Sequence, residues 1–290
     1  MVPGSGIRAL IARAGLALLA CSALGAIVAS SAQAAAPSTP PLAAALTQPV
    51  YGQTWAGYDA VAAAPAASGA LPHFTKVTGA WTQPAADCPT SGNSQASVWV
   101  GLGGVLDTAA VYGPLQVGTD SDCRHGRAQY FAWWEAYPEP LQAIRLKISP
   151  QDALTAVVSL DSAGLPVVAI SDETTGVGFT KVLRDVHVKA LATDSAEWIV
   201  EGPARRGITL TDFGSVSFAD ATATETGPTG VQTGSVDDAA WRYSEPDVLG
   251  ASVSGAHQSA VENSATPGPL TATGDGFTVN YGTGALSTAQ

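Results

Sequence analysis

The chain has 290 residues, of which 46% are hydrophobic and only 13% are charged. Its formal net charge is −11, from 13 basic and 24 acidic residues, and this balance argues against nucleic acid as a partner. Beyond the N-terminal segment, no apolar run is long enough to span a bilayer. The remaining length fits one large globular domain.

The first 34 residues have the pattern of a secretory signal peptide. Arg8 and Arg13 precede the apolar run GLALLACSALGAIVA, which ends at an Ala-Gln-Ala triplet. We therefore interpret residues 1–34 as a leader that is removed on export and expect a secreted, extracellular protein. A membrane anchor, or lipidation at Cys21, is the alternative.

The rest of the chain is expected to hold one folded domain. Residues 35–50 are rich in Ala and Pro and are interpreted as a flexible leader or a short propeptide. Residues 51–290 form the predicted domain. Because the signal segment carries two basic residues and no acids, its removal makes the net charge about −13, from 11 basic and 24 acidic residues.

Two cysteines, Cys88 and Cys123, remain after the signal segment. An even pair in an exported chain predicts one disulfide, which would stabilise the fold by about 3–4 kcal/mol if it acts by constraining the unfolded chain. Two free thiols are the alternative.

Short stretches of strand-like sequence follow one another along the chain, separated by glycine-bearing turns. They lie at residues 97–103, 111–118, 128–138, 143–148, 154–160, 165–170, 178–183, 213–222 and 276–282. No segment has long helical periodicity, so the pattern predicts an all-β antiparallel sandwich or barrel. Residues 225–270 are rich in Gly, Ser, Thr and Pro and are expected to be long connections rather than a second domain.

Several common catalytic motifs are missing. The chain has no His-Glu-x-x-His zinc motif and no Gly-x-Ser-x-Gly nucleophile motif. Asp107 and Asp161 begin Asp-Thr-Ala and Asp-Ser-Ala, which lack the glycine of aspartic peptidase loops. The sequence therefore nominates none of these catalytic types by a local motif.

The stretch AEWIVEG carries two glutamates, Glu197 and Glu201, in an otherwise apolar run. In a strand these two side chains share one face with Ile199, because alternate residues point the same way. Residues four apart on a strand are separated by ~13 Å, which exceeds the roughly 5–9.5 Å between the carboxyl groups of glycosidases. Either glutamate would therefore need a partner from another strand, and a glycosidase remains an alternative.

A series of short motifs, in the same order, resembles the glutamic peptidases, or eqolisins. The resemblance covers about residues 55–224. Its motifs are Trp55-Ala56-Gly57, TGAWTQP at 78–84, WVGLGG at 99–104, LQVGTD at 115–120, YFAWWEAYPE at 130–139, AEWIVE at 196–201 and FGSV at 213–216.

The resemblance implies a specific fold and chemistry. The fold would be an antiparallel β-sandwich of two long bent sheets, of the concanavalin or lectin-like jelly-roll kind. Glu201 and Gln116 would form a catalytic dyad that needs neither metal nor cofactor. The activity would be acid endopeptidase action on unfolded proteins or peptides by a monomer, with Glu201 as general acid and base and Gln116 stabilising the oxyanion.

The aromatic segment 128–138 should present two different faces. Phe131, Trp133, Glu135 and Tyr137 alternate on one side, so one row is expected to pack in the core and the other to line a substrate cleft. By resemblance, the candidate substrate-binding residues are Trp55, Trp99, Asp120, Trp133, Glu135 and Tyr137. Glu197 is assigned a supporting or solvent-facing role.

The sequence departs from the family pattern at two positions. Gly103 and Phe131 stand where the family has aspartates. Fewer carboxylates near Glu201 should lower its pKa, because like charges disfavour ionisation. A non-catalytic peptide- or glycan-binding sandwich derived from such enzymes therefore remains an alternative, beside the glycoside hydrolase.

Overall fold

The computed structural model describes residues 54–62, 72–105, 112–186, 191–203, 208–228, 230–244 and 264–282. These all belong to one compact unit, Ala45–Gln290. The predicted signal peptide and leader, residues 1–50, lie outside the described residues. Within the described ranges all regular structure is β, and no helix there has the length and hydropathy to cross a membrane.

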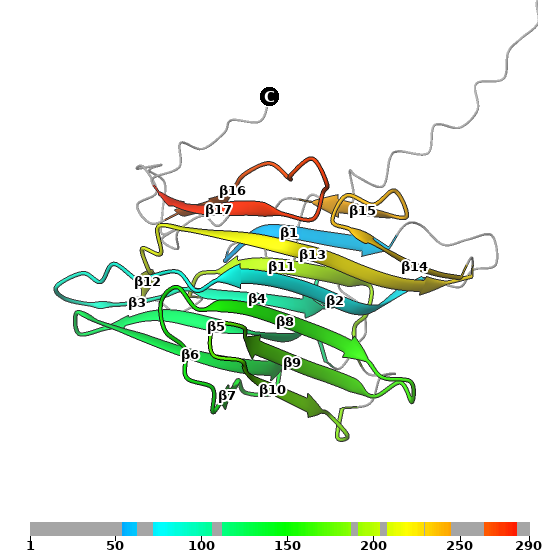
Figure 1. Ribbon diagram of the computed structural model, residues 1–290, viewed down its shortest axis with the longest axis horizontal. Coiled ribbons are helices and arrows are strands. Elements are labelled where there is room, and N and C mark those ends of the chain that lie inside the picture. The colour runs from blue at the N-terminus through cyan, green and yellow to red at the C-terminus, as the bar shows by residue number, and fades with distance from the viewer. Residues whose placement is uncertain are drawn as a thin grey trace, which may run out of the picture. The chain divides into compact units, whose positions relative to one another are not determined.

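One sheet has nine strands, in the order β12-β3-β5-β4-β11-β1-β15, with β6 paired to β5 and β7 paired to β6 (Figure 1). Its pairs are antiparallel except β12 with β3. The strands are β1 (Trp55–Ala62), β3 (Asn93–Gln95), β4 (Ser97–Leu102), β5 (Leu115–Arg124), β6 (Arg127–Ala136), β7 (Gln142–Ile144), β11 (Ser195–Glu201), β12 (Thr209–Leu210) and β15 (Trp241–Ser244).

The other sheet has eight strands, in the order β10-β9-β8-β2-β13-β17-β16, with β14 paired to β13. All of its pairs are antiparallel. The strands are β2 (His73–Thr82), β8 (Ala153–Leu160), β9 (Pro166–Asp172), β10 (Val177–Val182), β13 (Ser215–Gly227), β14 (Gly230–Ser235), β16 (Ser264–Pro267) and β17 (Phe277–Gly282).

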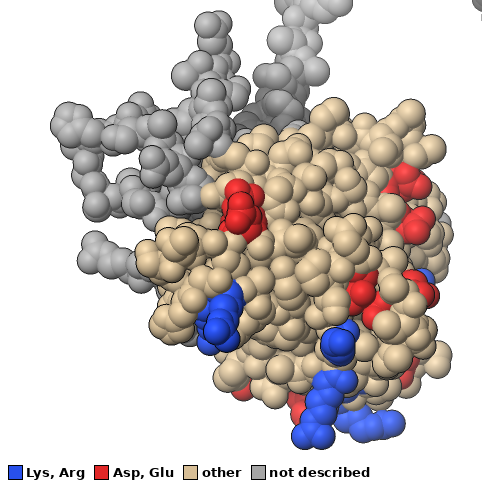
Figure 2. All heavy atoms as spheres, turned by 60° about the vertical axis from the view of Figure 1, so that its left-hand side comes forward, with Lys and Arg blue, Asp and Glu red and all other residues tan. Residues whose placement is uncertain are grey.

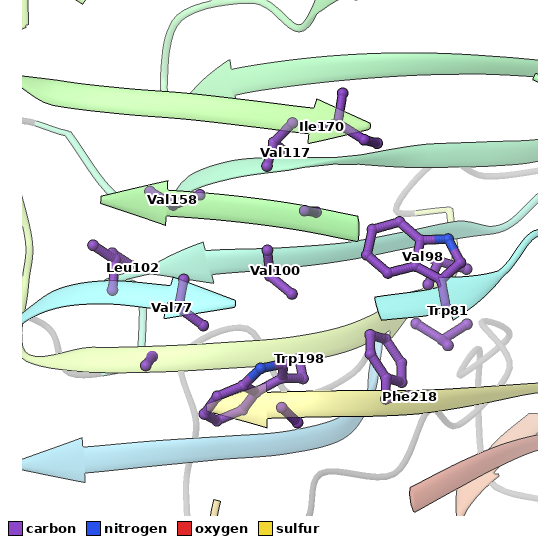
Figure 3. Close-up of a cluster of buried hydrophobic side chains, with 14 of the residues drawn as sticks. Val77, Trp81, Val98, Val100, Leu102, Val117, Val158, Ile170, Trp198 and Phe218 are labelled. Atoms are coloured by element: carbon purple, nitrogen blue, oxygen red, sulfur yellow. The ribbon is translucent and has the colours of Figure 1, made fainter. Parts of the chain in front are cut away.

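The main core lies between the two sheets. The nine-stranded sheet contributes Val98, Val100 and Leu102 from β4, and Trp81 of β2 and Phe218 of β13 come from the eight-stranded sheet (Figure 3). All five side chains are at most 3% exposed. Apolar burial between two antiparallel sheets confirms the predicted all-β sandwich.

The local patterns predicted several strands correctly. The hairpin expected at 154–160 and 165–170 is β8 and β9, paired from Leu154 opposite Asp172 to Leu160 opposite Pro166. Its turn contains Gly164 with φ +76°, a left-handed conformation that glycine adopts without strain. The last predicted strand is β17, which pairs with both β13 and β16.

Two expectations about strands were wrong. The stretch 143–148 pairs only within β7, at residues 142–144, although Ile144, Leu146 and Ile148 are all buried. Its alternation therefore reports burial against the core and not strand pairing. Within residues 225–270, β13 continues to Gly227 and β14, β15 and β16 follow, so this segment is not only connections. Its VLGASV stretch, residues 248–253, lies outside the described residues.

The predicted disulfide between Cys88 and Cys123 is confirmed, with a Cα–Cα distance of 5.5 Å. Cys123 lies near the end of β5 and is fully buried. The bond joins β5 to the segment that precedes β3. It therefore anchors one end of the strand that carries Gln116.

Ion pairs contribute little to the sandwich. The face drawn in Figure 2 carries its acidic and basic side chains in small separate groups on a largely uncharged surface. In the part of the chain that the structure describes, the one ion pair within 4 Å joins Arg124 to Asp122 at 3.5 Å. Since the guanidinium of this pair is exposed to solvent, we expect it to contribute about 0–1 kcal/mol, and backbone pairing and apolar burial hold the sheets together.

Candidate active site

The strand register brings the candidate residues onto one face of the nine-stranded sheet. Glu201 of β11 lies opposite Ser97 of β4, and Ser97 lies opposite Asp120 of β5. Gln116 precedes Asp120 by four residues on β5, so its side chain points to the same face. On β6, Glu135 lies directly opposite Gln116.

This face has its own apolar cluster, separate from the main core. Its members come from β1, β4, β6 and β11 and the segment after β4, and Phe131 packs against them; they are Trp55, Val61, Trp99, Val105, Trp133 and Ile199. Tyr130 and Trp134, on the other face of β6, pack against the main core. The predicted division of the aromatic segment into two faces is therefore confirmed.

Glu201 lies at the end of β11 beside tryptophan side chains. The indole Nε1–H of Trp99 donates a hydrogen bond to Glu201 Oε2 at 3.0 Å, and Thr54 Oγ1 lies 3.5 Å from Oε1. Trp55 also donates to the carboxylate. The rings of Trp55 and Trp99 meet edge to face, with centroids 5.0 Å apart, which fixes both indoles.

The pKa of Glu201 is raised to about 7. Burial is the main cause, because removal from water penalises the charged form, and the negative charge of Glu135 adds to it. The hydrogen bonds from Trp55, Trp99 and Thr54 act in the opposite direction without cancelling the effect. The residues around Glu201 in the sequence do not reveal this rise in pKa, because the enclosure is built by strands distant in the chain.

Gln116 is the second residue of β5 and its side chain is only 5% exposed. Its Nε2 donates to Glu135 Oε2 at 2.6 Å. Its carbonyl oxygen Oε1 is buried and has no hydrogen-bond partner among the described residues. This glutamine is therefore not a surface residue, and one of its polar atoms is left available for a further group.

Gly118 separates Gln116 from Asp120 on β5, opposite Trp99. A Cβ atom at this position would lie 2.3 Å from the carbonyl oxygen of Val98 and 2.5 Å from the Cβ of Trp99. Only glycine therefore allows β4 to approach so closely here.

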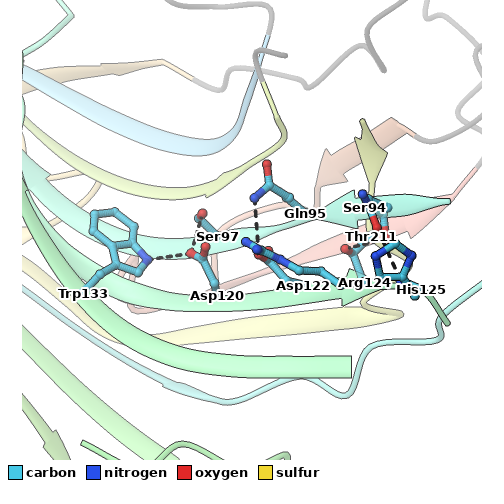
Figure 4. A network of polar contacts seen from close by, with 10 residues as sticks. Ser94, Gln95, Ser97, Asp120, Asp122, Arg124, His125, Trp133 and Thr211 are labelled. Atoms are coloured by element: carbon cyan, nitrogen blue, oxygen red, sulfur yellow. Dashed lines mark hydrogen bonds and ion pairs between the residues drawn. The ribbon is translucent and has the colours of Figure 1, made fainter. Parts of the chain in front are cut away.

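Asp120 is 5% exposed and organises the neighbouring polar contacts (Figure 4). Its Oδ1 accepts hydrogen bonds from Ser97 Oγ at 2.7 Å and from Trp133 Nε1 at 2.6 Å. Burial, followed by the charge of Asp122, raises its pKa to about 7. The hydrogen bond from Trp133 to Asp120 fixes the orientation of the indole.

The expectation that Glu197 could face solvent was wrong. Its side chain is fully buried, on the same face as Glu201, and the register places it between Asp59 and Gly101. Burial raises its pKa well above the usual value, the charges of Asp194 and Asp59 add to this, and a contact with Ser195 opposes it. The apolar cluster of the site face covers this side of β11, so the alternation of residues along the strand does not indicate a solvent-exposed side.

The two departures from the family pattern have different structural settings. Gly103 has φ +78°, and a Cβ there would lie 2.4 Å from the Cβ of Ala192, so an aspartate does not fit this backbone. Phe131 packs against the apolar cluster. Tyr137, just beyond β6, is 46% exposed and is the most accessible of the candidate binding residues.

Sequence reasoning missed Thr54 and Ser97, whose hydroxyl groups contact Glu201 and Asp120. Neither residue has a local signal, because each becomes relevant only through the pairing of β1, β4 and β5 with other strands. Among the described residues, no group of three or more His, Cys, Asp or Glu side chains is arranged to hold a metal ion.

Known proteins share this arrangement of strands. The structure is similar to scytalido-glutamic peptidase bound to a peptide-based transition-state analogue, with a TM-score of 0.55, 21% identity, and coverage of 79% of this chain and 98% of that one. It is also similar to SCP-B, a member of the eqolisin family of peptidases solved with the tripeptide Ala-Ile-His, with a TM-score of 0.54, 20% identity and the same coverage. At these identities the likeness concerns the fold.

The sequence comparisons go further. The chain is 31% identical to aspergillopepsin-2 of Aspergillus niger over 177 residues, which is 54% of this chain and 62% of that protein. The model of the Peptidase A4 family matches residues 53–262, the range that contains both Gln116 and Glu201. Because the family model matches more than half of the chain and the sheets have the eqolisin arrangement, the chain belongs to the Peptidase A4 family, the glutamic peptidases.

Proposed function

We propose that this protein is a secreted acid endopeptidase in which Glu201 and Gln116 act as the catalytic dyad. The main support is the electrostatic coupling across the site face. Glu135, which accepts a hydrogen bond from the Gln116 amide, is close enough to Glu201 to raise its pKa. The three side chains thus form one interacting group beside Trp55 and Trp99.

The raised pKa suits hydrolysis in acid. With a pKa of about 7, Glu201 is a neutral carboxyl group below neutral pH. A neutral carboxyl can act in two directions at once, because its O–H donates and its carbonyl oxygen accepts. A carboxyl group at the reference pKa of about 4.3 would instead be largely ionised in mild acid.

The proposed first step adds water to the peptide carbonyl carbon. As the C–O bond forms, a water proton passes to one oxygen of Glu201, and the carboxyl proton passes to the carbonyl oxygen of the substrate. The product is a neutral gem-diol, and Glu201 is again protonated. In the second step Glu201 protonates the leaving nitrogen and takes a proton from the diol as the C–N bond breaks.

Gln116 contributes hydrogen bonds without titrating. Its buried Oε1 can accept from the attacking water, and the N–H that does not bind Glu135 can donate to the carbonyl oxygen as negative charge develops there. Exposed Tyr137 would contact the rest of an extended peptide, whereas Trp99 and Trp133, which were expected to contact substrate, are at most 2% exposed and can only support the site from beneath its surface.

The test is cleavage of a reduced, alkylated protein by the purified secreted protein between about pH 3 and pH 8, in the presence of pepstatin. Internal fragments identified by mass spectrometry are expected in acid, with a rate that falls as the pH rises through about 7, where Glu201 loses its proton. Glu201→Gln should lower kcat about 10²–10⁴-fold and Gln116→Ala about 10²–10³-fold.

Two exposed residues provide matched controls. Glu173→Gln and Gln142→Ala make the same chemical changes in a turn after β9 and in β7, and both should retain normal activity. Full activity of the Glu201 and Gln116 variants would refute the dyad. Peptide or glycan binding without turnover at any pH would favour the binding module, and release of reducing sugar would favour the glycosidase.

A further inference from the structure

We infer that Glu135 is a positioning residue, which holds the Gln116 amide in the orientation that presents its carbonyl oxygen to the attacking water. This inference rests on the proposed function and assigns Glu135 a role beyond contact with substrate. It is supported by the hydrogen bond between Gln116 and Glu135 and by the buried Oε1 atom of Gln116, which has no partner among the described residues.

The hydrogen bond is set by the sheet itself. Gln116 and Glu135 are directly opposed on β5 and β6, and their side chains meet at an Nε2–Oε2 distance of 2.6 Å. A bond to a carboxylate is stronger than one between neutral groups, and the opposed backbones bring the two side chains together at little entropic cost. The contact therefore selects one of the two ways in which the amide can face.

The carbonyl oxygen of the Gln116 amide indicates the purpose of this orientation. With Nε2 tied to Glu135, Oε1 is buried without a partner among the described residues. A buried acceptor without a donor is costly, so this position favours a group that brings an O–H or N–H. Water bound between Gln116 and Glu201 has that chemistry, and a flipped amide would oppose it with N–H donors instead.

Among the described residues, no Lys, Arg or His side chain lies within ion-pair distance of Glu135. From β5 its neighbour is the neutral Gln116, and toward β11 its own negative charge acts on Glu201. On the other side, β7 presents neutral residues at 142–144. Burial raises the pKa of Glu135 and the bond from Gln116 opposes that rise. Glu135 is thus coupled to both members of the dyad.

Two substitutions at this position, with a control at Glu139, separate positioning from structure. Glu135→Ala should lower kcat about 10- to 100-fold with little change in KM, because the amide loses its anchor. Glu135→Gln can still accept the bond from Gln116 and should keep kcat within about tenfold. It removes a negative charge near Glu201, so the limb of the pH profile assigned to Glu201 should move to lower pH. Glu139→Gln, in the exposed turn after β6, is the control and should change neither quantity.

A double-mutant cycle tests whether Glu135 acts through Gln116. In the Gln116→Ala background, Glu135→Ala should cause no further loss of kcat. An undiminished loss in that background, or normal kcat in Glu135→Ala alone, would overturn the inference while leaving the dyad intact. If Gln116→Ala and Glu201→Gln are themselves fully active, the proposed function fails instead.

Discussion

The two sheets of this sandwich bury their strands in different ways. Strands β8 and β9 of the eight-stranded sheet alternate between buried and more exposed residues, as expected when one face meets water. Strands β5 and β11 of the nine-stranded sheet are buried at nearly every position, because the apolar cluster around Trp99 and Trp133 covers their second face. A β-sheet that is covered on both sides thus marks the candidate site.

The same difference governs the carboxylates. At the end of β9, Asp172 accepts hydrogen bonds from Thr174 N and from Thr175 N and Oγ1, at 2.6–3.2 Å. Burial alone would raise its pKa, but these bonds outweigh it and the pKa is lowered. On the covered face of the nine-stranded sheet, burial dominates and the pKa values of Glu201 and Asp120 rise to about 7. Hydrogen-bond donors supplied by a turn, together with burial, therefore decide which carboxyl groups stay ionised.

The largest expected effect on stability comes from replacing one glycine by alanine in each sheet and comparing the two losses. In Gly118→Ala the new Cβ would lie 2.3 Å from the carbonyl oxygen of Val98, an atom fixed in β4. We expect a loss of about 3 kcal/mol or more in the free energy of unfolding. In Gly178→Ala on β10 the nearest atom is Ser171 Oγ at 2.9 Å, at the end of a side chain that can rotate, so less than about 1 kcal/mol should be lost.

Urea denaturation followed by circular dichroism at acid pH measures both losses. Equal effects of the two substitutions would show that close approach of β4 and β5 is not a special constraint of the covered sheet.

An effect of intermediate size is expected from Glu197→Gln on the free energy of unfolding, measured as a function of pH. Because burial raises the pKa of Glu197 in the folded state, the folded protein holds a proton that the unfolded chain releases above about pH 4.5. Stability from this group is complete below that pH and is lost as the pH rises toward the folded-state pKa. Glutamine cannot ionise, so the variant should gain on the order of 2 kcal/mol over the wild type at mildly alkaline pH and little in acid.

Glu173→Gln, in the exposed turn between β9 and β10, controls for the loss of one carboxylate from the chain. A stability curve for Glu197→Gln parallel to that of the wild type at all pH values would contradict the assignment of a strongly raised pKa.

The smallest effect should come from Trp99→Phe, which keeps an aromatic ring and removes the donor to Glu201 Oε2. That donor favours the ionised carboxylate, so its loss should raise the pKa of Glu201 further. The pH at which activity declines should move up by roughly one unit. Trp81→Phe makes the same change in the main core, where the indole donates to Thr119 Oγ1, and should leave the pH profile in place. A profile unchanged in both variants would exclude control of Glu201 by Trp99.

Much of the fold was accessible from local pattern. The period-two alternation in 154–160 and 165–170 predicted β8 and β9 because one face of that sheet is exposed, which is the condition under which alternation is visible. The same reasoning failed for β14, β15 and β16. These short strands have few apolar residues, and they form because β13, β1 and β17 offer backbone partners.

For the site, motif order pointed to Gln116, Glu201 and the aromatic residues, and strand periodicity assigned their faces correctly. It could not identify the contact between Gln116 and Glu135, the enclosure of Glu201 by Trp55 and Trp99, or the complete burial of Glu197. Each depends on the register between strands far apart in sequence.

The sequence by itself determined the class of fold, the disulfide, the family and the faces on which the side chains of the candidate site lie. These follow from residue types and from the two-residue period of a strand, which are local properties. Only the tertiary structure decided which of those faces is covered, and with it the protonation of the carboxyl groups. The solvation of a charge depends on every atom around it, and here strands from opposite ends of the domain supply those atoms.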